Sequence, residues 1–219
     1  AEVKSAAVRG LARSQQGGRD LVALAKDGKL PKPLEPVAAL SVAACPWQDV
    51  KKAAADVLPM PKAKGGGQLP PVADLVKRNG SVDRGKTVFA GVGTCAKCHI
   101  VGNEGKSVGP NLSGIGAKLS RPALYESILA PSAAISHNYE TWVAQLADGR
   151  SVSGLLISRT PEEVVIRGPD GIDVKAAAKD VEELVKQPVS LMPADLAATL
   201  SADELVDLIA WLETLKAAN

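Results

Sequence analysis

The chain has 219 residues, enough for one or two domains, and a formal net charge of +2 at pH 7. So small a charge argues against a nucleic-acid-binding protein or one attached to an anionic membrane. Hydrophobic residues make up 46% of the sequence and aromatic residues only 3%. The sequence contains no apolar run long enough to cross a bilayer, so no transmembrane segment is predicted.

Residues 1–58 predict short helices rich in Ala, Val and Leu. The expected helices are 3–12, 19–26, 34–44 and 48–58. Gly17-Gly18 is expected to separate the first two. Repeated short helix pairs favour a HEAT-like or armadillo-like segment. Such arrays usually need more repeats to be stable, so we expect the chain to be one end of a longer protein.

Cys45 lies in this segment among alanines, which favours a buried and unreactive thiol over an intermolecular disulfide. Residues 59–71 predict a linker, because glycines bend such a segment and prolines stiffen it. Met60 is expected to pack locally or to lie in this linker. A helix over residues 72–78 should lead into the next domain.

The run Cys95-Ala96-Lys97-Cys98-His99 carries the clearest chemical signal of the chain. C-x-x-C-H is the attachment signature of c-type haem, in which both thiols become thioethers and the histidine binds the iron. A zinc site needs a second Cys/His pair, and only Cys45 and His137 remain, far apart in sequence. A thioredoxin-like motif would follow a hydrophobic strand, whereas residues 91–94 are Gly-Val-Gly-Thr. We therefore predict one covalent haem c.

The flanks of this motif predict how the histidine is held. His99 must donate its second N–H to a carbonyl or carboxylate to fix the ring, and the loop at Gly109-Pro110 can present the Pro110 carbonyl. Upstream, residues 83–91 predict a short helix.

A second helix is expected near the C-terminus. Ser201 and Glu204 form a capping box at its start. Its apolar stripe consists of Leu205, Leu208, Ile209, Leu212 and Leu215. This helix is expected to cross the helix over residues 83–91 near Gly85, Phe89 and Trp211.

The sixth iron ligand should be a soft or imidazole donor, and the chain has few of these. Met60, Met192 and His137 are the only Met and His residues besides His99. Met192 precedes Pro193, which rigidifies the loop just ahead of the terminal helix, so Met192 is the predicted ligand. A methionine can instead fill a core. His137 is the alternative ligand, although a surface or hydrogen-bonded histidine is the more common case.

The segment between His99 and Met192 changes its hydrophobic period halfway. A helix is expected over residues 121–130, ended by Pro131. The expected strands are 141–146, 151–157, 164–166, 172–174 and 181–185. Asp148-Gly149 between apolar alternations is a strong hairpin signal. We expect a small antiparallel sheet or barrel at about 139–187 that braces the Met192 loop and covers the haem, or alternatively forms a docking surface.

Several short sequence motifs, separated along the chain, occur in the order found in one protein family. Those similar to class I cytochromes c are Gly85-Lys86-Thr87-Val88-Phe89, the C-x-x-C-H run, Val108-Gly109-Pro110-Asn111-Leu112 and Met192-Pro193. Those that resemble the planctomycete/verrucomicrobial haem-binding domain are residues 126–135, 139–142 and 190–193. The resemblance covers residues 72–219. It implies a cytochrome fold, covalent haem, His/Met ligation and electron relay. In that family the domain commonly ends large membrane-associated or secreted dehydrogenase-like proteins with a β-propeller and helical repeats.

The expected fold is mainly α: a HEAT-like segment at 1–58, a linker at 59–71, and a class I cytochrome c domain at 72–219 with the inserted sheet. The cofactor-binding residues are expected to be Cys95, Cys98, His99, Pro110 and Met192, with His99 and Met192 as iron ligands.

A six-coordinate haem iron has no open coordination site, so we expect an electron-transfer module and not an enzyme. The alternatives are a haem enzyme or ligand sensor with a labile sixth ligand, and an interaction module with a structural haem. The expected partners are an upstream dehydrogenase and a downstream acceptor, with no nucleic acid. Lys97, Lys106 and Lys118 could orient an acidic partner at the haem edge or be ordinary solvated lysines. Covalent haem in what the resemblance marks as a bacterial protein implies a periplasmic or otherwise exported location, although no signal peptide begins this chain.

Overall fold

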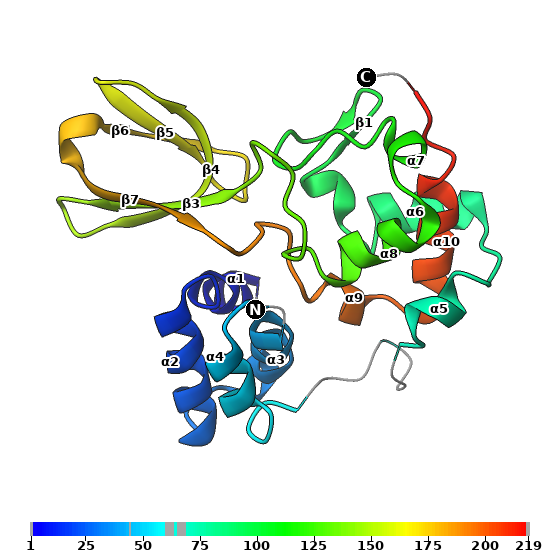
Figure 1. Cartoon of the computed structure of the whole chain (residues 1–219), viewed down its shortest axis with the longest axis horizontal. Helices are drawn as coiled ribbons and strands as arrows, with labels where there is room; N and C mark the ends of the chain where they lie inside the picture. The colour runs from blue at the N-terminus through cyan, green and yellow to red at the C-terminus, as the bar shows by residue number, and fades with distance from the viewer. Residues whose placement is uncertain (1, 44, 60–63, 65–68, 218–219) are drawn as a thin grey trace.

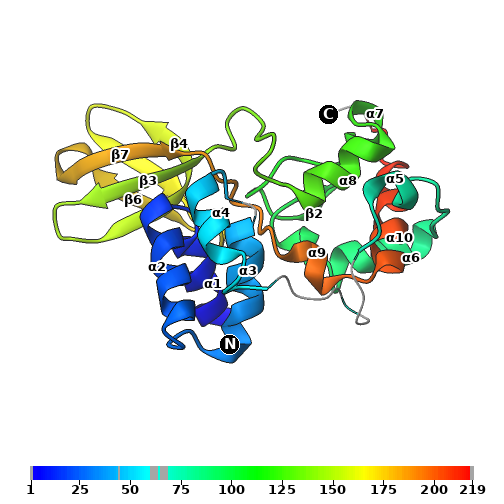
Figure 2. The same ribbon diagram turned by 60° about the horizontal axis from the view of Figure 1, so that its bottom comes forward.

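The computed structural model describes residues 2–43, 45–59, 64 and 69–217. Its described elements fall into three regions (Figures 1 and 2): a group of N-terminal helices, a helical region that carries the C-x-x-C-H motif, and a sheet. Each region has its own cluster of buried hydrophobic side chains. Met60 lies outside the described residues, as does most of the linker expected at 59–71.

The N-terminal helices pack around a core that includes Leu21, Val42, Cys45 and Val50. They are α1 (Glu2–Leu11), α2 (Gln15–Lys26), α3 (Glu35–Ala43) and α4 (Gln48–Ala54), with a 3-10 turn η1 (Lys32–Leu34) before α3. The last helix is therefore shorter than the expected 48–58.

The expected break at Gly17-Gly18 is wrong, because both glycines lie inside the first turns of α2. The reason is close packing. A Cβ on Gly17 would lie 2.2 Å from the Leu11 carbonyl oxygen, and one on Gly18 would lie 3.0 Å from Cγ1 of Val50. Ser14 caps the helix instead, since its hydroxyl accepts a hydrogen bond from the Gly17 N–H.

The region around the C-x-x-C-H motif is built from short helices and one small hairpin. Its elements before the sheet are α5 (Val72–Leu75), α6 (Val82–Ala90), η2 (Cys95–Lys97), β1 (Ile100–Val101), β2 (Glu104–Gly105), α7 (Ile115–Lys118) and α8 (Arg121–Leu129). After the sheet come α9 (Leu196–Thr199) and α10 (Ala202–Leu212). The helix expected over 72–78 is thus only a single turn, α5.

Helices α6 and α10 cross where the sequence predicts. A Cβ on Gly85 would lie 2.0 Å from the Asp207 carbonyl oxygen, so only glycine permits this approach. The Phe89 and Trp211 ring centroids lie 4.7 Å apart with the rings tilted by 52°. The predicted capping box is also confirmed, with Ser201 and Glu204 each bonded to the other's backbone N–H. The two helices therefore form the centre of this region's core.

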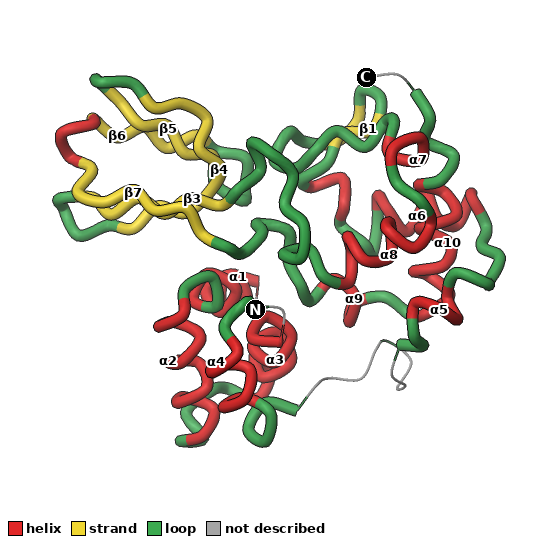
Figure 3. Tube along the Cα trace, in the orientation of Figure 1, coloured by secondary structure: helices red, strands yellow, loops and turns green. Residues whose placement is uncertain are grey.

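A five-stranded antiparallel sheet separates α8 from α9 in the chain. Its strands are β3 (Thr141–Leu146), β4 (Ser151–Arg159), β5 (Glu163–Arg167), β6 (Asp173–Ala177) and β7 (Val181–Gln187), in the order β6-β5-β4-β3-β7. The 3-10 turn η3 (Ala178–Asp180) brings β7 back beside β3, where Thr141 pairs with Gln187. The sheet thus begins and ends at one place, next to the helical region (Figure 3).

The expectation of a mainly α chain is not confirmed, since the sheet accounts for most of residues 141–187. The helices of 2–54 carry no feature that supports a HEAT-like assignment. Within the part of the chain that the structure describes, no helix is both long and apolar enough to cross a bilayer.

Candidate haem-binding site

The cysteine motif lies on a tight turn after α6. Thr94 has a left-handed backbone, with φ of 54°, and the 3-10 turn η2 follows directly. The N–H groups of Cys98 and His99 both donate to the Cys95 carbonyl, at 3.0 and 2.9 Å. This turn brings the two thiols and the imidazole into one short stretch of rigid backbone.

The His99 ring is held by one hydrogen bond. Its Nδ1 lies 2.7 Å from the Pro110 carbonyl oxygen. Because a carbonyl only accepts, Nδ1 carries the proton and Nε2 keeps its lone pair. Burial lowers the pKa of His99, and the hydrogen bond to Pro110 acts in the opposite direction. A neutral imidazole with a free Nε2 is the form that binds a metal.

The loop that presents Pro110 is itself fixed to the motif. The N–H groups of Val108 and Gly109 both donate to the Cys98 carbonyl, at 3.0 and 2.6 Å. A Cβ on Gly109 would lie 2.5 Å from Cε1 of His99. The loop therefore packs directly against the imidazole, and only glycine leaves room for the ring.

Neither motif cysteine forms a disulfide, and Cys45 forms none either. Burial raises the pKa of Cys95 to about 11. Burial also raises the pKa of Cys98, although Lys106 and Lys97 oppose this shift. Both side chains are accordingly protonated near neutral pH, and thioether formation adds the S–H bond across a vinyl group.

Met192 is half-buried and packs against the same hydrophobic cluster as Cys95 and the α6–α10 core. Its N–H donates to the Ser190 hydroxyl at 3.1 Å, and the Ser190 N–H donates to Ser132 at 3.1 Å. His137, the alternative ligand, lies on an exposed loop with 88% of its side chain accessible and Glu140 3.7 Å away.

These residues fit a c-type haem on the chemistry of their donors. Two neutral thiols, one imidazole nitrogen free of hydrogen bonds and one thioether share a single hydrophobic cluster or its adjoining turn. No group of three or more His, Cys, Asp or Glu residues within the described chain could hold a bare metal ion. The zinc alternative therefore gains no support from the described side chains.

Lys97, Lys106 and Lys118 are all exposed, and Lys106 reaches the Asp170 carbonyl at 3.5 Å.

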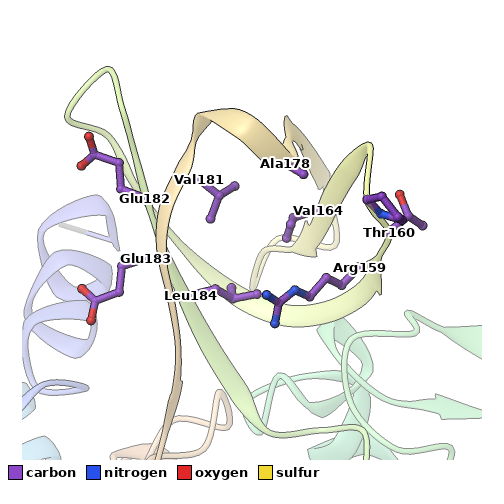
Figure 4. Close-up of a pocket in the computed structure, with 9 residues that line it drawn as sticks. Arg159, Thr160, Val164, Ala178, Val181, Glu182, Glu183 and Leu184 are labelled. Atoms are coloured by element: carbon purple, nitrogen blue, oxygen red, sulfur yellow. The ribbon is translucent and has the colours of Figure 1, made fainter.

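A separate cavity of about 530 Å³ lies in the curve of the sheet (Figure 4), with Val164, Val181 and Leu184 in its lining. None of its lining residues belongs to the motif or could ligate iron as a thioether or imidazole. We therefore do not connect this cavity with the haem.

Two long-range contacts at the site were missed at the sequence level. Arg167 on β5 donates to the Ser107 carbonyl at 3.1 Å, which joins the sheet to the loop that presents Pro110. Arg9 on α1 binds both carboxylate oxygens of Asp195, three residues after Met192. Neither arginine carried a signal in the sequence, because each partner lies tens of residues away.

Residues 82–147 match the cytochrome c family model. The chain therefore contains a cytochrome c domain over these residues, which supports covalently bound haem c, haem-based electron transfer and redox partners in general. The match includes Cys95, Cys98 and His99 and ends before Met192. The narrower planctomycete/verrucomicrobial type is not confirmed by it. No curated protein matches the chain.

Proposed function

We propose that the chain is an electron-transfer module that holds one haem c through Cys95 and Cys98, with His99 and Met192 as the axial iron ligands. The observation that carries this proposal is the 2.7 Å hydrogen bond from His99 to Pro110, which leaves Nε2 free for iron. Met192 is the second ligand because its thioether is half-buried against the cluster that also contains Cys95.

The iron supplies the redox chemistry when haem is bound, by gaining and losing a single electron. The chain's residues hold it: the thiols fix the porphyrin, and the Pro110 carbonyl orients the imidazole. With both axial positions filled, no site remains for a substrate, so the module is not itself an enzyme. The exposure of His137 supports this, since a distal histidine would have to be buried beside the iron.

The electrons come from a dehydrogenase, joined to the same polypeptide or bound to it, and pass to a separate acceptor. Joining donor and cytochrome would raise their effective concentration, so a net charge of only +2 would suffice without long-range steering. From covalent haem attachment we infer a periplasmic or otherwise exported protein. The planctomycete/verrucomicrobial resemblance of residues 126–135 and 190–193 supports this assignment.

Spectroscopy of one methionine variant and one histidine variant tests which residue is the sixth iron ligand. Met192→Ala should abolish the weak charge-transfer band of Met-ligated ferric iron and let imidazole or cyanide bind readily. His137→Ala, at an exposed position, should leave both properties unchanged. Loss of the band in His137→Ala but not in Met192→Ala would instead assign the ligand to His137.

The relay is tested in the full-length native protein. If donor and cytochrome are joined, adding the dehydrogenase substrate should reduce the haem of the same polypeptide at a rate independent of protein concentration. A strictly bimolecular rate would instead indicate that the cytochrome is a separate electron carrier. Substrate turnover by this chain alone would contradict electron transfer as its sole function and would favour the haem enzyme.

A further inference from the structure

Arg9 on helix α1 and Arg13 in the turn that follows this helix both contact the loop that contains Met192. Arg9 Nε and Nη2 lie 2.9 and 2.7 Å from the two carboxylate oxygens of Asp195. Arg13 Nη2 lies 3.5 Å from the Leu191 carbonyl oxygen. The two contacts therefore fall on either side of Met192 and Pro193. Both ribbon views place the segment from β7 to α9 beside the N-terminal helices (Figures 1 and 2).

The contact between Arg9 and Asp195 is a desolvated, two-point ion pair. Only 5% of the Asp195 side chain and 29% of the Arg9 side chain are exposed. Two parallel N–H···O bonds fix both distance and orientation, which one ammonium–carboxylate contact would not do. Breaking a buried pair leaves a charge without a partner, so this contact resists opening more than an exposed salt bridge does.

The Asp195 carboxylate is engaged with Arg9 and does not cap α9. Asp195 occupies the N-cap position of that helix, yet its side chain makes no capping hydrogen bond there. An aspartate at an N-cap normally accepts from the first-turn N–H groups. The carboxylate is turned instead toward α1, and the loop is thereby attached to the N-terminal helices.

Arg13 adds a second point of attachment. Burial, followed by the nearby charge of Arg9, lowers the pKa of Arg13 to about 10. The guanidinium nonetheless remains charged at neutral pH and donates to the Leu191 carbonyl. Leu191, the residue before Met192, is therefore held by the turn that directly follows the helix that binds Asp195.

We propose that Arg9 is a positioning residue for Met192: acting through Asp195, it makes the N-terminal helices a clamp that keeps the Met192 thioether in place. This inference rests on the proposed ligation of iron by Met192. A partner that displaced α1 would loosen the loop, open the sixth coordination position and lower the reduction potential, because a methionine ligand raises it.

The test compares Arg9→Gln with Arg19→Gln in the full holoprotein. Arg19 also binds a carboxylate through Nε and Nη2, but its partner Asp49 lies in the N-terminal helices and the pair is about half exposed. The measured quantities are the rate of imidazole binding to the ferric haem and the reduction potential. Arg9→Gln should bind imidazole about tenfold faster, equivalent to about 1.4 kcal/mol, and have a lower potential. Arg19→Gln should stay within about twofold of the wild type.

The conservative variant Arg9→Lys separates positioning from charge. It keeps the cation but loses the two-point geometry, so its imidazole rate should fall between those of wild type and Arg9→Gln. If Arg9→Gln yields no holoprotein, Asp195→Asn is measured in its place and should show the same direction of change.

Met192→Ala distinguishes this inference from the ligation on which it rests. If Met192→Ala leaves the charge-transfer band and the imidazole rate unchanged, the proposed ligation fails and the clamp fails with it. If Met192→Ala changes both but Arg9→Gln behaves like Arg19→Gln, the ligation stands and the clamp alone is overturned.

Discussion

Asp207 on α10 accepts three hydrogen bonds from the start of α6: from the Ser81 N–H at 2.6 Å, and from Arg84 Nε and Nη2 at 2.6 and 3.0 Å. The Asp207 side chain is only 6% exposed, although that of Arg84 is mostly accessible. One carboxylate thus joins the two helices that frame the haem region, beside the glycine at which they cross.

Removing this charge should weaken the fold. Asp207→Asn should lower the free energy of unfolding by about 1–3 kcal/mol, because hydrogen bonds to a charged group are lost in a nearly buried site. Asp83→Asn, which changes an exposed carboxylate on α6, should alter the free energy of unfolding by less than about 0.5 kcal/mol. Denaturant titration of both holoproteins at pH 7 measures the difference, and equal losses would contradict the account.

The ion pair between Asp207 and Arg84 predicts that the free energy of unfolding depends on pH. Hydrogen bonds from Arg84 hold the pKa of Asp207 below its ordinary value. A lowered folded-state pKa contributes stability above the unfolded value of about 3.9, and that contribution is lost as pH falls through the folded value. The difference in unfolding free energy between wild type and Asp207→Asn should therefore be constant near neutral pH and shrink below about pH 4. A difference that grows on acidification would reverse the sign and contradict this assignment.

Gly109→Ala should disturb the proximal histidine. The added Cβ would lie 2.5 Å from Cε1 and 2.8 Å from Nδ1 of His99, so either the ring or the Pro110 loop must move. We expect a stability loss of about 1–3 kcal/mol and an altered haem spectrum. Gly10→Ala is the control, because nothing lies within 4 Å of its new Cβ in helix α1. An unchanged spectrum in Gly109→Ala would mean that the loop does not orient the ring.

Counting free thiols tests both the haem attachment and the state of Cys45. The chain has three cysteines, and thioether formation would leave one. Burial raises the pKa of Cys45, so a thiol reagent should react slowly with the native holoprotein near neutral pH. After unfolding, one thiol should react in the wild type and none in Cys45→Ala. Three reactive thiols in the unfolded wild type would exclude thioether bonds.

The sheet should stabilise the haem site, because both of its ends connect to the helical region that carries the C-x-x-C-H motif. Thr141 and Gln187 are paired neighbours, so a short flexible linker can replace residues 139–187 without separating the ends. This replacement should loosen the Met192 loop, lower the reduction potential and lower the melting temperature. An unchanged potential and melting temperature would reject the bracing role.

A point variant examines the sheet's contact with the proximal loop. Arg167→Ala should shift the haem spectrum, because it removes the 3.1 Å hydrogen bond to the Ser107 carbonyl. Arg150→Ala is a matched control, since the Arg150 side chain pairs with Asp148 at a hairpin within the sheet. Equal spectra for the two variants would show that Arg167 has no special role at the haem.

Local features of the site could be predicted from the sequence, because the interacting residues lie only 3 to 11 positions apart. The capping box at Ser201 and the loop that offers Pro110 to His99 are of this kind. Gly17-Gly18 was misinterpreted because close packing against the Leu11 carbonyl and the Val50 side chain, and not turn formation, requires small residues there.

The contacts that join the three regions could not be predicted. Arg9 and Asp195 are 186 positions apart, and each is an ordinary charged residue in its own segment. Asp195 stands at the N-cap position of α9, where a short polar side chain would ordinarily cap the helix. Only the folded arrangement of α1 against the Met192 loop shows that this carboxylate binds an arginine instead.

The central claim is that one covalent haem, saturated by His99 and Met192, carries single electrons. A redox titration of the holoprotein followed by its visible spectrum tests it most directly. We predict a low-spin haem in both oxidation states, one electron per chain, the charge-transfer band of a Met-ligated ferric iron, and haem that stays attached on unfolding in acid. Haem released on unfolding, or a five-coordinate high-spin spectrum, would contradict the account.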